Sequence, residues 1–136
     1  MRAPMIIDQA DVVADVTRQF RAYEKAFMAN DVDALIAFFW DDARLTRYGI
    51  ADRQFGIEEM RTFRRASPTP TFTRRIDNLR ITSFGADMAV AYCEFVRSDT
   101  PLRGFQSQTW VRLAETGAAP ARWKIVSAHV SMIAFG

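Results

Sequence analysis

A stripe of apolar residues near the N-terminus constrains the fold of this chain more than any other feature. Within residues 11–30, apolar side chains recur at steps of four, four, three and four, at Val12, Val16, Phe20, Tyr23 and Phe27. Because an α-helix has about 3.6 residues per turn, this spacing puts all five on one face. The segment is therefore predicted to be a long amphipathic helix that buries this face against another layer.

Tyr23 is the one member of the stripe that carries a polar group. A buried hydroxyl costs free energy unless it makes a hydrogen bond. A backbone carbonyl as partner would make Tyr23 a core residue, and a group in a cavity would make it a site residue. Tyrosine side chains ordinarily ionise near pH 10, so a role as base or nucleophile would need a neighbouring cation, for which Arg47 is the candidate.

The rest of the chain contains two shorter helical segments and five segments with strand character. The predicted helices are 32–39, capped by Asp31, and 57–65, which ends before the prolines of 67–70. Asp8 or Asp11 is expected to cap the first helix. The predicted strands are 43–48, 71–83, 88–97, 104–114 and 122–133. Short connections between the last four are typical of an antiparallel meander.

This order of elements predicts an α+β fold with one domain over residues 1–136. Helices come first and a run of strands follows, so one sheet is expected to pack its inner face on the helices. A strongly bent sheet wrapped on the long N-terminal helix would leave a conical space at one end. The C-terminal half of that helix and the inward strand residues would line a small polar pocket there.

Composition excludes several classes of function. With 136 residues, 49% of them hydrophobic, the chain suffices for one core. Its 16 acidic residues are interspersed among 18 basic ones, which argues against nucleic-acid binding. No apolar run reaches the roughly 18–20 residues of a membrane span. The run at 4–7 is too short for a signal peptide, and the single cysteine, Cys93, cannot form an intrachain disulfide, so a cytoplasmic location is expected.

Arginine supplies nearly all the positive charge, because Lys25 and Lys124 are the only lysines. The guanidinium fork suits carboxylates and phosphates, although a GC-rich genome produces the same bias. Arg47 alternates with Leu45 on a predicted strand and should point inward with it. A buried arginine needs an anionic partner. That partner is either an internal carboxylate, for which Glu94 is the candidate, or the carboxylate of a ligand.

Several further polar residues are candidates for ligand contacts. Gln106 and Gln108 share strand parity with Trp110, and inward amides suit a urea or a carboxylate because they both donate and accept. His129 shares parity with Trp123 and is either a structural residue or a substrate contact. A basic cluster is expected to be solvated except for Arg64, which turns toward the pocket; its members are Arg61, Arg64, Arg65, Arg74 and Arg75.

The spacing of the residues gives little support for a metal site or a catalytic triad. His129 is the only histidine, and Cys93 has no companion at ligand spacing, so no metal site is predicted. No Ser-His-Asp or Cys-His arrangement is indicated.

Four segments, in their order and spacing, resemble the NTF2-like superfamily, also called SnoaL-like or cystatin-type cone proteins. They are NDVDAL at 30–35, FWDDA at 39–43, FGIEEMR at 55–61 and WKIVSAHVS at 123–131. Within it the chain is similar to the AtzH/HpxZ-like group, associated with oxalurate and cyanuric-acid catabolism. The residues that carry this are RAYE at 21–24, TRYGI at 46–50, FR at 63–64, QSQTWVR at 106–112 and AHVS at 128–131. The loop DRQF at 52–55 departs from the pattern expected of the group, at the pocket rim.

The resemblance implies a fold and an activity. The fold is an NTF2-like cone, a strongly bent antiparallel sheet wrapped on a long N-terminal helix with two shorter helices. The activity is hydrolysis or decarboxylation of a short carboxylated urea or amide, such as 1,3-dicarboxyurea or oxalurate. Arg47 would clamp a carboxylate and Tyr23 would transfer or position a proton. The resemblance carries over only Tyr23 and Arg47; from the residue pattern, Gln108 and His129 are expected to orient substrate or water, and no cofactor is implied.

The expected partners are the small anionic substrate, a second copy of the chain in a homodimer formed through the sheet, and an amidase of the same pathway. Two alternatives stay open. The chain could be a non-catalytic ligand-binding or accessory protein for that amidase, because the predicted site lacks a conventional nucleophile or metal. It could also be an interaction module that uses the outer face of its sheet.

Overall fold

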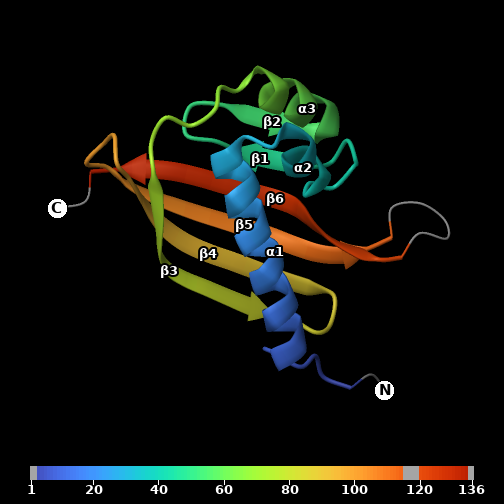
Figure 1. Cartoon of the computed structure of the whole chain (residues 1–136). Helices are drawn as coiled ribbons and strands as arrows, with labels where there is room; N and C mark the ends of the chain where they lie inside the picture. Colours follow the sequence, from blue (N-terminus) through green and yellow to red (C-terminus); the bar gives the residue numbers. More distant parts are fainter. Residues whose placement is uncertain (1–2, 115–119, 135–136) are drawn as a thin grey trace.

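The computed structural model describes residues 3–114 and 120–134, which form one six-stranded sheet with helices on one side (Figure 1). The helices are α1 (Ala10–Ala29), α2 (Val32–Ala37) and α3 (Gly56–Ala66). The strands are β1 (Thr46–Tyr48), β2 (Arg53–Phe55), β3 (Arg74–Ser83), β4 (Met88–Arg97), β5 (Arg103–Leu113) and β6 (Arg122–Ile133). The predicted α+β class is confirmed, and the sheet order is β2-β1-β6-β5-β4-β3.

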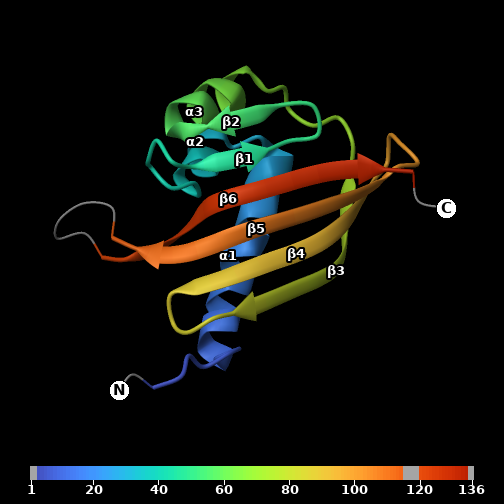
Figure 2. The ribbon, with the colours of Figure 1, turned by 180° about the vertical axis from the view of Figure 1, so that it is seen from behind.

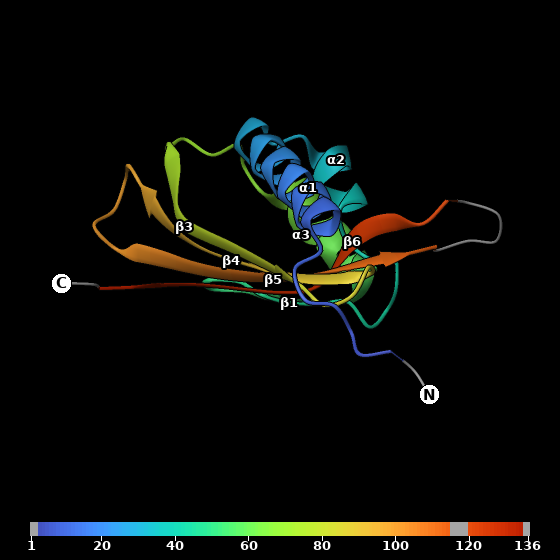
Figure 3. The same cartoon turned by 90° about the horizontal axis from the view of Figure 1, so that it is seen from below.

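Strands β3 to β6 form the predicted antiparallel meander, and β1 extends the sheet by pairing with β6 in parallel. Helix α1 crosses one face of the meander (Figure 1), and the opposite face carries no helix (Figure 2). Seen along the sheet, all three helices lie on the same side (Figure 3). The molecule therefore has two layers, with one sheet face buried and the other uncovered.

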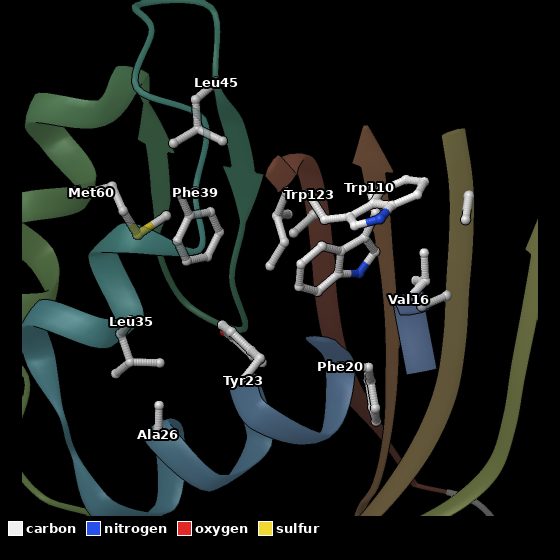
Figure 4. Packing of buried hydrophobic residues seen from close by; sticks show 14 of the residues in the cluster. Val16, Phe20, Tyr23, Ala26, Leu35, Phe39, Leu45, Met60, Trp110 and Trp123 are labelled. Atoms are coloured by element: carbon white, nitrogen blue, oxygen red, sulfur yellow. The ribbon is translucent and has the colours of Figure 1, made fainter. Parts of the chain in front are cut away.

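The α1 stripe is the centre of the core. Val16 and Phe20 are at most 1% exposed, and Tyr23 is 4% exposed. Figure 4 shows this helix face turned toward Trp110 and Trp123 of the sheet. Each fully buried apolar side chain contributes about 1.5–3 kcal/mol, so this face fixes α1 on the sheet.

The ends of the helices differ in part from the prediction. Neither Asp8 nor Asp11 caps α1; the N-cap is Gln9, which makes no side-chain cap bond. The Asp8 carboxylate instead accepts from the Ser83 amide at 3.0 Å and fastens the N-terminal segment to β3. Asp31 caps α2 as predicted, accepting from the Ala34 amide at 3.3 Å.

Helix α2 is shorter than the predicted 32–39 because the following residues join the sheet. The Trp40 amide donates to the Ile125 carbonyl at 3.0 Å, and the Ile125 amide donates to the Phe38 carbonyl at 2.8 Å. Pairing with β6 thus ends the helix. Among the described helices, none has the length and apolar character needed to cross a membrane.

The segment 52–55, expected to be a loop, contains β2. Residues Arg53–Phe55 pair antiparallel with β1, so Gln54 lies opposite Arg47. The predicted strand 43–48 is correspondingly reduced to its last three residues, since the Asp42 carboxylate accepts from the Arg44 amide at 2.8 Å in a turn. This short hairpin carries two of the polar groups of the site.

Candidate functional site

A small cavity lies between the C-terminal half of α1 and the sheet. Its volume is about 60 Å³, room for a few water molecules or a small carboxylate at roughly 10–15 Å³ per water. The polar side chains on its wall are Tyr23, Arg47, Arg74, Arg97 and Gln106. The apolar part of the wall includes Phe27, Phe72 and Phe95. The structure therefore brings the predicted pair, Tyr23 and Arg47, to one cavity.

Arg47 projects inward from β1, as its alternation with Leu45 predicted, and is 8% exposed. Its Nη1 donates to Asp52 Oδ1 at 2.9 Å and to Gln54 Oε1 at 2.8 Å. Gln54 Nε2 donates to the same Asp52 oxygen at 2.9 Å, which closes a triangle of hydrogen bonds. Within the described residues, all hydrogen bonds of the Arg47 side chain run through Nη1, so Nε and Nη2 are left for a ligand.

The prediction that Glu94 is the internal partner of Arg47 is wrong. Glu94 accepts from Arg103 Nε at 3.1 Å and from Asn78, away from Arg47. The carboxylate beside Arg47 belongs to Asp52, which pairing of β1 with β2 brings back toward Arg47. Sequence reasoning missed it because the hairpin was not predicted.

Burial lowers the pKa of Arg47 from its ordinary value. The oxygen of Tyr23 and the carboxylate of Asp52 act in the opposite direction and raise that pKa, while the neighbouring positive charge of Arg64 lowers it. The guanidinium is thus a desolvated cation, and a desolvated cation attracts an anion more strongly than one in water.

Tyr23 makes its hydrogen bond to an arginine and not to a backbone carbonyl. Arg64 Nη2 donates to Tyr23 Oη at 2.9 Å. The ring packs edge-on against Phe38 and Phe39, with centroids 5.7 and 6.0 Å apart. The phenol is thereby fixed from both sides at the cavity wall. The cation in contact with the phenol is Arg64, whereas the expectation named Arg47.

Arg64 turns inward from α3, as predicted, and is 4% exposed. It is not among the residues that line the cavity. Its guanidinium lies over the rings of Phe27, Phe39 and Phe63 at 5.4–5.9 Å from their centroids. Arg64 therefore lies behind Tyr23 as seen from the cavity, whereas the sequence predicted that it would contact the substrate.

Gln106 and Gln108 both face inward, in agreement with their parity. Gln106 lines the cavity and accepts from Arg74 Nη2 at 3.1 Å. Gln108 is not on the cavity wall, and its Oε1 accepts from Trp110 Nε1 at 3.1 Å. Gln108 satisfies a buried indole, and Gln106 is the amide within reach of a ligand.

Arg74 was expected in a solvated cluster, and this is wrong. Its side chain is 6% exposed and forms a two-point pair with Glu24, with Nη2–Oε1 at 2.6 Å and Nε–Oε2 at 3.2 Å. Sequence reasoning missed both residues of this pair. The available signal was the alternation of Arg74 with Ile76 on β3, which puts Arg74 on the inner face.

His129 lies on the outer face of the sheet, so its expected inward position is wrong. The β5–β6 register shifts where Thr109 pairs with Ser127 and Trp110 with Ile125, which leaves Val126 as an extra residue. Such a bulge reverses the parity of the strand. His129 is consequently exposed and packs against Tyr48, with ring centroids 5.9 Å apart.

The structure also bears on metal binding and on thiol chemistry. In the part of the chain that the structure describes, no three His, Cys, Asp or Glu side chains gather as a metal site would require. Burial raises the pKa of the Cys93 thiol to about 12, so it is protonated near neutral pH and is a poor nucleophile.

The fold and sequence match proteins of known structure. A protein of unknown function from Pectobacterium atrosepticum is 45% identical over 95% of this chain and 98% of that one, with a TM-score of 0.86. A cystatin-like fold protein from Burkholderia xenovorans is 42% identical over 97% and 99%, with a TM-score of 0.90. An NTF2-like superfamily protein from Salmonella enterica, 20% identical over 90% and 92%, has a TM-score of 0.70 and shares the fold.

A search of curated protein sequences gave no match. The family model described as AtzH-like matches residues 5–135, which is nearly the whole chain. The predicted cone fold is confirmed by the cystatin-like and NTF2-like structures. The chain belongs to the AtzH-like family.

Proposed function

We propose that this protein binds a short carboxylated urea or amide in the α1 cavity and cleaves it by hydrolysis or decarboxylation. The observation that supports this is the meeting of Tyr23 and Arg47 on the wall of one small cavity. A buried cation and a buried phenol beside each other suit a ligand with a carboxylate next to a nitrogen. 1,3-Dicarboxyurea has that arrangement, and in oxalurate one carbonyl carbon stands between the carboxylate and the nitrogen.

Arg47 is the proposed carboxylate clamp. Its Nη1 is held by Asp52 and Gln54, which fixes the plane of the guanidinium. The remaining nitrogens offer two parallel donors to a carboxylate, the geometry that arginine uses most often for this group. Because the clamp is 8% exposed, little water competes for it. The same charge would stabilise negative charge that develops on the ligand during reaction.

Tyr23 is the proposed proton donor or positioning group. Both candidate reactions need a proton on the nitrogen of the bond that breaks. In decarboxylation the carbon–nitrogen electron pair stays on nitrogen and carbon dioxide leaves; in hydrolysis water adds to the carbonyl carbon and the amine leaves. Gln106, also on the wall, can hold the urea or amide group in place.

A second candidate function is ligand binding without turnover, as an accessory to an amidase of the same pathway. It is favoured by the absence, among the described residues, of an activated nucleophile on the cavity wall. The Cys93 thiol is protonated at neutral pH and is engaged by Gln106 Nε2 at 3.8 Å. Water would have to be the nucleophile in the catalytic case.

Kinetics with 1,3-dicarboxyurea separate the candidates. Tyr23→Phe is expected to lower kcat by about 10²–10⁴-fold, the usual contribution of a positioned proton donor, with little change in KM. Arg47→Ala is expected to lose binding and turnover together. Tyr92→Phe and Arg65→Ala are matched controls, because both positions are exposed, and should behave as the parent does.

Each alternative outcome has a clear meaning. If both site variants convert the compound as fast as the parent, the catalytic proposal is wrong. If calorimetry shows that the parent binds the compound but no product forms, the accessory function replaces it.

A further inference from the structure

Arg64 carries a buried positive charge that no carboxylate balances within the described part of the chain. It is 4% exposed, and it makes none of the ion pairs found among those residues. Its Nε is buried without a hydrogen-bond partner there. Three phenylalanine rings and the oxygen of Tyr23 are its surroundings. A buried cation without a counter-charge is destabilising, so its presence beside Tyr23 points to a role there.

The direction of the Arg64–Tyr23 hydrogen bond limits what Tyr23 can do. A guanidinium only donates, so Tyr23 Oη is the acceptor of this bond. The hydroxyl proton must then point elsewhere, and among the described residues no side chain or carbonyl accepts it. Tyr23 lines the cavity, so the hydroxyl proton can point into the cavity, toward a ligand or a water molecule.

We infer that Arg64 is the positioning residue for Tyr23: it holds the phenol oxygen so that the hydroxyl proton points into the cavity, and it faces the negative charge left when that proton departs. This deepens the proposed function and rests on it for the reaction itself. Arg64 touches neither the cavity nor, by this inference, the ligand, and acts only through Tyr23.

The proton step balances with water as the only further reactant. The Tyr23 O–H bond breaks and an N–H bond forms on the leaving nitrogen, while the bond between that nitrogen and carbon breaks. The phenolate oxygen then faces Arg64 and Arg47, both of which carry positive charge. Water returns the proton to the phenolate. In hydrolysis the attacking water supplies it while its oxygen stays on the carbonyl carbon; in decarboxylation a solvent water supplies it, and the hydroxide that is left combines with the carbon dioxide to give bicarbonate.

The test compares Arg64→Met, Arg64→Lys and the control Arg65→Met on the exposed side of the same helix. Arg64→Met is expected to lower kcat about tenfold or more while KM changes less than about twofold, because a charge-assisted hydrogen bond acts on Tyr23 and not on the ligand. Arg64→Lys keeps the charge and should recover part of the loss. Arg65→Met should match the parent.

A double variant supplies the decisive comparison. In a Tyr23→Phe background, Arg64→Met is expected to cause no further loss of kcat, since the group it positions is already gone. Losses that multiply would overturn the inference. Thermal unfolding is measured for each variant. A methionine can replace a buried arginine without loss of stability, so a lower kcat in a variant as stable as the parent reports an effect on the site and not on the fold.

A second readout does not depend on turnover. The chain has three tyrosines, so ¹³C labelling of the tyrosine Cζ gives three signals, and Tyr23→Phe identifies one of them. Arg64→Met is expected to shift the Tyr23 signal and leave those of Tyr48 and Tyr92 in place, and Arg64→Lys should shift it less. An unmoved Tyr23 signal contradicts the inference even if catalysis is observed; a shift in a protein that converts no substrate contradicts only the proposed function.

Discussion

Gly49 shows how closely the residues around Arg47 fit together. A Cβ at this position would lie 2.3 Å from Asp52 Oδ1 and 2.8 Å from Arg47 Nη1. Both contacts are shorter than real Cβ atoms make, so the bond between Asp52 and Arg47 must give way in Gly49→Ala. We expect a rise in KM for the carboxylated substrate and a loss of about 1–3 kcal/mol in the free energy of unfolding, measured by urea denaturation.

Asp52→Asn is the matched variant for this test. It keeps an oxygen acceptor for Arg47 Nη1 and introduces no clash, so it should lose less stability than Gly49→Ala. A Gly49→Ala protein with the stability and KM of the parent would mean that the turn between β1 and β2 shifts at no cost, and that the triangle around Arg47 is not needed.

Residue patterns predicted which side chains face inward, but not what they contact. Alternation put Arg47, Gln106 and Gln108 on the inner face, and all three are there. It could not supply the partners: Asp52 meets Arg47 only because β1 and β2 form a hairpin, which alternation within one strand does not indicate. His129 failed for another reason: one extra residue in β6 reverses parity, and nothing in the local sequence marks the bulge.

The Arg74–Glu24 pair joins β3 to α1 beside the cavity. The two side chains are 6% and 12% exposed, so removing one charge leaves the other buried and unpaired. Glu24→Gln is therefore expected to lower the free energy of unfolding by about 3–5 kcal/mol, measured by chemical denaturation. Replacing both residues, as Glu24→Leu with Arg74→Met, should recover most of this loss.

The Asp15–Arg18 pair on the same helix is the control for Glu24→Gln. Its side chains are 48% and 70% exposed, and an exposed pair contributes at most about 1 kcal/mol. Asp15→Asn should therefore change stability little. Equal effects of Asp15→Asn and Glu24→Gln would show that burial of the α1–β3 pair does not decide its strength.

The long elements were predictable, and the short ones were not. The stripe of α1 and the alternation of β4 and β6 extend over enough residues for a period to be recognised, and the predicted bounds of β4 and β6 are those observed. Strands β1 and β2 have three residues each, shorter than two full periods of alternation. Strand β1 pairs with β6, which is distant in sequence, and β2 is held in the sheet by its pairing with β1.

The uncovered face of the sheet is a candidate surface for a partner (Figure 2). Large apolar side chains are exposed there, including Tyr92 at 52% and Met88 at 39%. The same face contains a broad hollow lined by Tyr92, Phe105, Arg80 and Glu94, among others. Because this face carries both positive and negative side chains, it can pair with the same face of a second copy across a two-fold axis.

We propose that a second copy of the chain covers this face, and expect a dimer in sedimentation velocity at micromolar concentrations. Tyr92→Glu places a charge in the centre of the face and should give a monomer, while Arg65→Glu, on α3, should leave the dimer intact. The cavity lies between α1 and the inner face of the sheet, so kcat per chain should stay within about twofold in the monomer if the site is complete in one chain. A parent protein that sediments as a monomer up to about 100 μM would contradict the dimer, because interfaces of about 800 Å² per partner normally hold at that concentration.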